Sequence, residues 1–498
     1  MSDVDRRFRA LLREDLLSFT RMAFKTIEPG TPFQTNWHNH ALAYQLARVA
    51  RGECRRLIVN VPPRSGKSIS VSVALPAWIL GRDPTRKIMV VSYGQELARK
   101  HAIDFRKVVE SECYRQVFSD LGVERRRQRD TELVTAAGGG CIRRSMSGGI
   151  HGLGADVMII DDPIKPLDAF SEAHRRNANE LYDNALYPRI NDKKTGAIII
   201  VMQRLHEEDL VGHVLDKEHW EVLSIPAIET EEQIYRLGAH PRDVHRRRTG
   251  DVLHPEREPR EVLDVLRRTL GSLSFSAQYQ QNPLPVEGNI IKREWLRYYE
   301  AAPESFDLTV ASWDTASTQE ENSDYSVGSI WGLKDANMYL LEVIRAKLEV
   351  PELRRLIIDT HRRYRVNTTL IENTDIGRAI GQDLRRSTRV HPLMPRPRYD
   401  KQARLLAHSA RFEAGDVLLP REAPWLASYI AELLGFPVGA HDDQVDSTSQ
   451  ALDYMWQRLS SVTPPVRPNP PRPPGLVRPA PSRPLGRRRR SNGTLLDP

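Results

Sequence analysis

The segment that decides the fold of the first part of the chain is Arg55–Leu80, which reads RRLIVNVPPRSGKSISVSVALPAWIL. An apolar run predicts a β-strand, a tight loop follows that ends in Gly66, Lys67 and Ser68, and the remainder predicts a helix. Backbone N–H groups at the amino end of a helix attract anionic oxygens. The order of strand, loop and helix therefore predicts a site that cradles phosphate groups.

The side chains of this loop suit a nucleotide with its metal ion. Lys67 can reach the β- and γ-phosphates, and Ser68 can hold Mg²⁺. Arg64 is a candidate for stabilising the charge that develops during phosphoryl transfer, in its own site or in that of a neighbouring subunit. One departure from the usual pattern is Val61, which stands where a glycine is expected six residues before Lys67.

A second apolar run, ADVMIIDDPIK at 155–165, predicts a buried strand that ends in two carboxylates. Phosphoryl transfer needs one acidic group on Mg²⁺ and another near the attacking water. We assign Asp161 to the metal and Asp162 to the water. A further strand ends in Gln203 and Arg204, polar groups that could sense the departing γ-phosphate. The residues expected to bind the nucleotide, with Gln34 as the adenine contact, are Gln34, Arg64, Ser65, Gly66, Lys67, Ser68, Asp161 and Gln203.

Strands and helices alternate through the first part of the chain, which predicts a mostly parallel sheet covered by helices on both faces. Its expected strands are 56–61, 87–92, 157–161 and 197–202. Between about 207 and 280 the strand signal fades into charged helices and loops, which indicates a small subdomain or linker.

A second α/β pattern begins at residue 308. A strand to 315 and two strands around the turn-rich KDAN predict three antiparallel strands. The two strands of this hairpin are expected at 325–333 and 338–347. The later expected elements are a helix at 351–364, a strand at 369–372, a helix from 376 and a helix at 444–458.

Acidic residues stand at the ends of these elements. The candidates are Asp314, Glu372, Asp442, Asp443 and Asp446, with Asp324 as a further one. Grouped carboxylates repel one another unless divalent cations neutralise them, and two metal ions about 4 Å apart can activate a water for phosphodiester hydrolysis. Asp314, Glu372 and Asp443 are the expected ligands, with Asp446 or Asp442 in support. Asp443 and Asp446 are three residues apart and so share a helical face.

The net charge of +8 lies almost entirely in the tail. From Thr463 the chain carries eight Arg and one acidic residue, Asp497, which together account for +7. Eleven prolines in the same 36 residues predict disorder. DNA contact by the folded part would need local patches such as 125–129 or 143–144, although charge runs are more often solvated faces.

Composition excludes two further classes of protein. No apolar run approaches the ~20 residues of a membrane helix, and the charged N-terminus lacks the apolar stretch of a secretory signal. Three widely spaced cysteines, Cys54, Cys113 and Cys141, indicate neither a disulfide framework nor a zinc cluster. We expect a cytoplasmic protein without a membrane partner.

Five segments in this order resemble the large subunit of the phage terminase, the DNA-packaging motor of tailed phages and prophages. They are PPRSGKS, GGIHGLGADVMIIDDP, VMQRLHEEDL, FSAQYQQNPLP and HDDQVDS. The resemblance extends from about Phe33 to Leu452. It implies a P-loop ATPase that translocates double-stranded DNA and a ribonuclease H-like nuclease that cuts concatemers. Lys67 and Ser68 match the family's phosphate loop, and Asp161 and Asp162 match its acidic strand end. Gln203 and Arg204 lie in its coupling segment, and its nuclease carboxylates are matched by Asp314, Glu372 and Asp443.

The resemblance also implies cofactors and partners. The cofactors are ATP with Mg²⁺ and two divalent ions, Mg²⁺ or Mn²⁺, in the nuclease. The partners are DNA, the portal protein of the capsid, a small terminase subunit and further copies of the chain in a ring on the capsid, all in the host cytoplasm.

The expected organisation is an α/β chain of several parts. They are an ATPase core at 1–206, a small subdomain and linker at 207–304, a nuclease domain at 305–460 and a disordered tail at 461–498. One alternative is a host repair helicase-nuclease, which would need a second motor domain, and the sequence holds no second phosphate loop. Another is a non-catalytic prophage remnant that only binds DNA or capsid, against which the intact Lys67, Asp161 and Asp314 argue.

Overall fold

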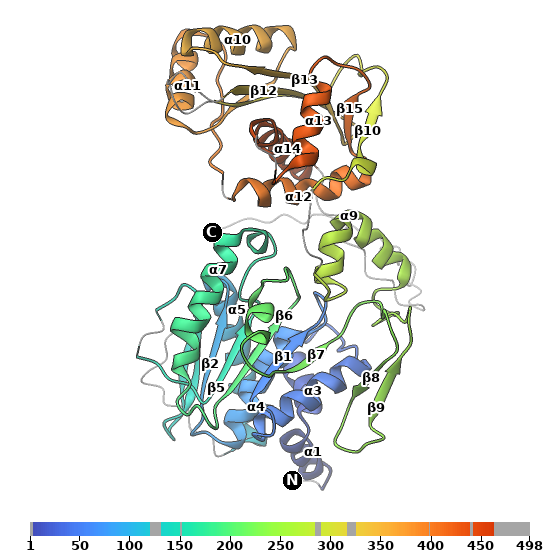
Figure 1. Cartoon of the computed structure of the whole chain (residues 1–498). Coiled ribbons are helices and arrows are strands. Elements are labelled where there is room, and N and C mark those ends of the chain that lie inside the picture. The colour runs from blue at the N-terminus through green and yellow to red at the C-terminus, as the bar shows by residue number, and fades with distance from the viewer. Residues whose placement is uncertain are drawn as a thin grey trace, which may run out of the picture. The chain divides into compact units, whose positions relative to one another are not determined.

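The computed structural model of the chain describes residues 3–119, 131–149, 152–283, 290–315, 325–397, 399–438 and 442–462 (Figure 1). The basic run 125–129, the candidate Asp324 and the Pro/Arg-rich tail from Thr463 lie outside the described residues. By its contacts the chain divides after Met455.

The first sheet has seven strands, and all neighbouring strands are parallel except β3 and β4. In spatial order they are β3 (Glu132–Val134), β4 (Gly140–Ser145), β2 (Lys87–Ser92), β5 (Val157–Asp161), β6 (Ala197–Met202), β1 (Arg56–Asn60) and β7 (Glu221–Ser224). The strands β1, β2, β5 and β6 confirm the predicted ones to within one residue. β7 was not predicted: it lies in the segment assigned to a small subdomain, yet it pairs with β1.

Alternate residues of these strands enter two different cores. Leu57 and Val59 of β1 face one core, whereas Ile58 faces the other. Because both faces of each central strand are buried, the strands read as continuous apolar runs. The helices of the first core are α1 (Asp3–Glu14), α2 (Leu16–Ile27), α3 (Trp37–Ala50), the π-helix η1 (Ile69–Ala74), α4 (Leu75–Arg82), α5 (Gln95–Val109) and α6 (Glu112–Val117). Those of the second are α7 (Glu172–Leu181), η4 (Tyr182–Leu186) and α8 (Leu210–Leu215).

After β7 the chain forms a smaller cluster of its own. Ala227, Ile228, Leu263, Phe275 and Tyr279 pack together there. The helix α9 (Arg260–Gln278), which is kinked at Gly271, contributes Leu263 and Phe275 to it. The antiparallel hairpin of β8 (Gln233–Arg236) and β9 (Val244–Arg247) instead packs Tyr235 into the first core.

The second sheet has six strands, and its centre is the predicted antiparallel arrangement. In spatial order they are β10 (Arg297–Tyr299), β15 (Val417–Pro420), β13 (Asn337–Ala346), β12 (Ser326–Lys334), β11 (Leu308–Asp314) and β14 (Thr368–Ile371). The turn between β12 and β13 places Asp335 and Ala336 at positive φ, as tight hairpin turns require.

Helices cover this second sheet on both faces. α10 (Val350–Arg363) and α11 (Asp375–Ser387) share a core with Trp313 of β11. On the other face, Ser447 of α14 (Asp443–Val462) donates a hydrogen bond of 2.9 Å to the carbonyl of Ser312. Since side chains alternate along a strand, Asp314 faces α14 together with Ser312. The remaining helices are α12 (Lys401–Ala414) and α13 (Leu426–Gly435) (Figure 1).

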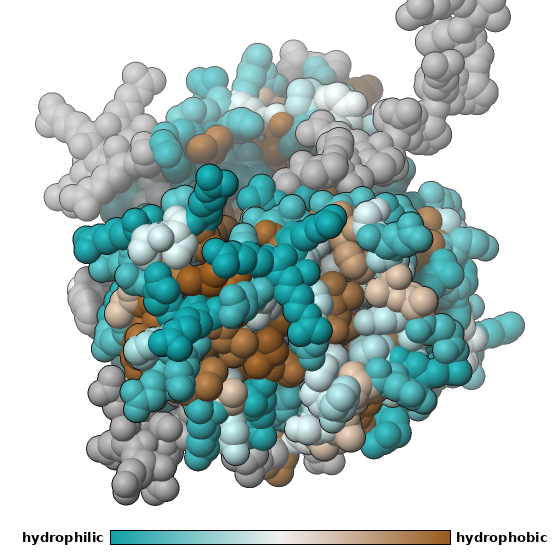
Figure 2. All heavy atoms as spheres, turned by 90° about the horizontal axis from the view of Figure 1, so that it is seen from above, coloured by the Kyte–Doolittle hydropathy of each residue, from teal (hydrophilic) through white to brown (hydrophobic). Residues whose placement is uncertain are grey.

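One face of the molecule is drawn with its atoms coloured by hydropathy in Figure 2. Hydrophilic residues cover most of the face in Figure 2, with hydrophobic residues showing between them. None of the helices in the described ranges is long and apolar enough to cross a membrane.

Candidate functional site

Lys67 connects three strands of the first sheet at one edge. Its Nζ lies 3.0 Å from Oδ1 of Asp162, which follows β5, and 2.8 Å from Oε1 of Gln203, which follows β6. β1, β5 and β6 are parallel neighbours, so their carboxyl ends meet where open α/β sheets bind ligands. The structure therefore brings together the predicted phosphate loop, the predicted base and the predicted γ-phosphate sensor.

Asp161 is fully buried beside the same loop. Ser68 Oγ lies 3.2 Å from one of its oxygens, and Ser72 Oγ donates to the other at 2.6 Å. His101 Nε2 is 3.7 Å from that second oxygen. Sequence reasoning missed Ser72 and His101, although the spacing of Ser68 and Ser72 places both on one helical face.

The hydroxyl and carboxylate oxygens of Ser68 and Asp161 form a donor set of the kind that Mg²⁺ prefers. Burial raises the pKa of both Asp161 and Asp162, and the charge of Lys67 opposes that rise. Burial also lowers the pKa of His101 to about 4. His101 is therefore neutral near pH 7, which leaves Lys67 to balance the two carboxylates.

Side chains from outside the phosphate loop contact its backbone carbonyl groups. Arg257 donates a 2.6 Å hydrogen bond to the carbonyl of Arg64, which adopts a φ of 64°. His38 Nε2 lies 3.3 Å from the carbonyl of Ser65. The side chains of Arg64 and Gln34 are exposed, and their predicted roles toward charge and adenine stay predictions.

Arg204 does not fit the predicted role of phosphate sensor. Its Nε contacts both oxygens of the fully buried Asp209, at 3.1 and 3.0 Å. Its backbone N–H donates to Oε1 of Gln281 at 3.0 Å. Together with Gln280, which bonds both backbone groups of Ile228, this contact gives the FSAQYQQNP segment a structural role.

The second group of carboxylates forms around the end of β11. Asp314 ends β11 and Glu372 follows the parallel strand β14, which brings the two carboxyl groups close enough to raise the pKa of Asp314. Burial and the adjacent Glu372 raise the pKa of Asp314 to about 10, with smaller contributions from the charges of Asp446 and Asp443. Burial also raises the pKa of Asp443, while the charges of Lys401 and Arg345 act in the opposite direction.

Asp446 is engaged differently from the metal ligand that the sequence predicted. Arg404 contacts its Oδ1 at 2.7 Å and Lys401 contacts its Oδ2 at 2.6 Å. Lys401 also contacts Asp442 at 2.8 Å. Because cations occupy both oxygens, Asp446 joins α14 to α12 in this structure. No spacing pattern in the sequence signals this pairing, because its partners lie 42 and 45 residues upstream.

The pair of Asp314 and Glu372 offers oxygen ligands of the kind that divalent cations bind. In the part of the chain that the structure describes, no group of three or more His, Cys, Asp or Glu is arranged to hold a metal ion. The structure thus assembles two of the three predicted nuclease ligands, and Asp443 lies near enough for its charge to act on Asp314.

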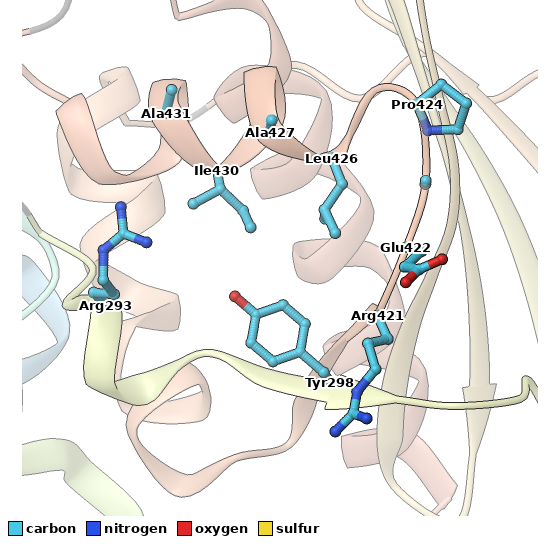
Figure 3. Close-up of a pocket in the computed structure, with 10 residues that line it drawn as sticks. Arg293, Tyr298, Arg421, Glu422, Pro424, Leu426, Ala427, Ile430 and Ala431 are labelled. Carbon is cyan, nitrogen blue, oxygen red and sulfur yellow. The ribbon is translucent and has the colours of Figure 1, made fainter.

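A cavity of about 920 Å³ lies between β10 and α13, beside the second sheet. Tyr298 and Ile430 line it, with Arg293, Arg421 and Glu422 around them (Figure 3). It contains one carboxylate and none of the residues predicted from the sequence. We therefore do not assign the chemistry to this cavity.

Residues 311–455 match the family described as the terminase RNaseH-like domain. No curated protein matches the chain. Among solved structures, the large terminase of a thermophilic bacteriophage is similar over 83% of this chain and 98% of its own, with 10% identity and a TM-score of 0.53. The same phage protein in complex with ADP is similar over 83% and 98%, with 11% identity and a TM-score of 0.51.

These similarities agree with the two sheets of the chain. At such low identity the solved structures establish the fold alone. Residues 311–455 thus match the terminase RNaseH-like domain, and the chain as a whole is similar in its α/β fold to a phage large terminase.

Proposed function

We propose that this chain is the subunit of a viral DNA-packaging motor that hydrolyses ATP to translocate double-stranded DNA and cuts concatemeric DNA with a metal-dependent nuclease. The observation that carries the proposal is the contact of Lys67 with both Asp162 and Gln203, on a fold shared with a large terminase. A phosphate-binding lysine in contact with an acidic strand end is the arrangement that phosphoryl transfer uses.

In the first site, each side chain has a distinct task. Lys67 binds the β- and γ-phosphates, and Ser68 with Asp161 would hold Mg²⁺, which neutralises developing charge on the phosphates. Asp162 orients the attacking water. Gln203 contacts Lys67 at 2.8 Å, so loss of the γ-phosphate would change the contacts of Gln203 at the end of β6.

In the second site, Asp314 and Glu372 would hold divalent cations, with Asp443 as a third ligand. The bound ions, Mg²⁺ or Mn²⁺, supply an activated water and stabilise the leaving oxygen of a phosphodiester. The support is electrostatic: two carboxyl groups interact with each other, and the pKa of one is raised to about 10, so the pair retains a proton without a cation. It becomes a dianionic site when a cation displaces that shared proton.

The partners follow from the same proposal. DNA, the portal protein and a small terminase subunit are the expected partners, with several copies of the chain forming a ring on the capsid in the host cytoplasm. The rival reading, a repair helicase-nuclease, needs a second motor domain, and the described residues contain one sheet with a phosphate loop.

The test separates the two activities in the full chain. We expect Lys67→Ala to abolish DNA-stimulated ATP hydrolysis and to retain metal-dependent plasmid cutting. Asp314→Ala should abolish cutting and retain ATP hydrolysis. Loss of both activities in both variants, with the fold intact by circular dichroism, would refute separate sites.

A further inference from the structure

We propose that Tyr325, Arg345 and Lys347 form a binding site for the backbone phosphates of the DNA strand that the nuclease cuts. This inference rests on the proposed nuclease function. It concerns how a site lined with carboxylates can hold a polyanion.

The position of Arg345 follows from the strand register. Asp314 of β11 pairs with Val327 of β12, and Val327 pairs with Arg345 of β13. Directly opposed residues on neighbouring strands lie on the same face of a sheet. Arg345 therefore lies on the face of Asp314, two strand spacings or roughly 10 Å away.

The three residues form one cluster. The guanidinium carbon of Arg345 is 3.9 Å from the centre of the Tyr325 ring, and Nζ of Lys347 is 5.1 Å from it. An arginine stacked on an aromatic ring keeps its N–H edge directed sideways. Two cations therefore gather around one ring beside the carboxylates.

These cations differ from their neighbours in what they contact. Lys401 and Arg404 are already neutralised by Asp442 and Asp446. Within the residues that the structure describes, Arg345 and Lys347 are in no ion pair with a carboxylate. Arg345 lowers the pKa of Asp443 through its charge without forming an ion pair with it, so both cations remain available for an anionic ligand.

The unsatisfied donors of Arg345 match a phosphate in shape. Nε and Nη2 are shielded from solvent and have no hydrogen-bond partner among the described residues. These two N–H groups point from the same edge of the guanidinium, the geometry that binds two phosphate oxygens at once. A shielded donor without an acceptor is unfavourable, and a phosphate oxygen would satisfy it once the half-buried Arg345 side chain turns its donor edge toward the DNA.

The test compares variants of the full chain in Mn²⁺-dependent plasmid cutting. We expect Arg345→Ala to lower the rate at saturating DNA at least tenfold and Lys347→Ala to raise the KM for DNA at least threefold. Arg345→Lys should recover only part of the rate, because an ammonium lacks the paired donors. ATP hydrolysis should be unchanged in all three variants.

Lys334→Ala is the matched control, since Lys334 stands at the opposite end of the β12–β13 hairpin and pairs with Asp307. It should cut like the wild type. Wild-type kcat and KM in the Arg345→Ala/Lys347→Ala double variant would overturn the inference. If Arg345→Ala lowers the melting temperature, the exposed Lys347 and the conservative Arg345→Lys carry the test. A wild-type chain that does not cut DNA at all would instead refute the proposed nuclease.

Discussion

The two sites differ in how the negative charge of a pair of acidic residues is balanced. In the first site Asp161 and Asp162 are adjacent in sequence, and Lys67 contacts Asp162 directly. In the second site Asp314 and Glu372 come from the ends of two strands, and their carboxyl groups interact with each other. Among the described residues, no cation contacts that pair. The first site carries its own counter-charge, whereas the Asp314–Glu372 pair keeps one proton near neutral pH unless divalent cations replace it. Under the proposed function, this difference makes the charge balance of the second site depend on its metal ions more than that of the first.

The largest expected effect is the selective loss of one activity while the other is retained. Asp162→Asn should lower ATP hydrolysis at least a thousandfold, equivalent to about 4 kcal/mol in the barrier, because the attacking water loses its orienting carboxylate. Glu372→Gln should lower plasmid cutting by a similar factor. Each variant should keep the other activity, measured in steady-state assays on the same preparations. Glu422→Gln, in the cavity beside α13, is the control for both.

Cationic side chains near the second site that already pair with a carboxylate should contribute to the stability of the fold. Arg404→Met leaves the buried Asp446 with one partner fewer and should lower the free energy of unfolding by about 3 kcal/mol. Urea unfolding measures this loss. Arg354→Met removes an exposed pair with Asp383 and should cost less than about 1 kcal/mol. Equal losses would show that Asp446 is not anchored through Arg404.

The Asp314–Glu372 pair predicts that the free energy of unfolding depends on pH. The pKa of Asp314 is raised to about 10 in the folded chain, so between about pH 4 and pH 10 the folded state binds the proton more tightly than the unfolded one. Metal-free stability should therefore fall as pH rises through this window. Asp314→Asn should remove that contribution and raise the free energy of unfolding at pH 8 by at least about 1.4 kcal/mol, which corresponds to one pKa unit. The exposed Asp335→Asn serves as control, and an unchanged pH slope in Asp314→Asn would contradict this explanation.

The smallest expected effect concerns the orientation of Asp161. Ser72→Ala removes a buried hydrogen bond of 2.6 Å and should weaken Mg²⁺-ATP binding by about 1 kcal/mol, roughly fivefold. Nucleotide binding with and without Mg²⁺ distinguishes this from a general loss of stability, because only the Mg²⁺-dependent part should change. Thr26→Ala, which removes a hydroxyl bond within α2, is the matched control.

Local patterns predicted the elements better than the contacts between them. The buried runs that became β1, β5 and β6 were recognisable because parallel strands are apolar on both faces. β7 was missed because its four residues alternate in exposure at the sheet edge. The pairing of Lys67 with Gln203 was not predicted, although the meeting of parallel strand ends at one edge explains it. The pairing of Arg204 with Asp209 and of Asp446 with Arg404 did not, because either acid could equally have faced a ligand.

Proton release on metal binding tests the central claim most directly. Calorimetric titration of Mn²⁺ into the nucleotide-free chain at about pH 7.5, in two buffers of different ionisation enthalpy, counts the protons displaced. The account predicts release of about one proton by the wild type and by Lys67→Ala, because a cation must replace the proton of the Asp314–Glu372 pair. Glu372→Gln should bind Mn²⁺ weakly and release none. Tight Mn²⁺ binding by the wild type without proton release would contradict the account.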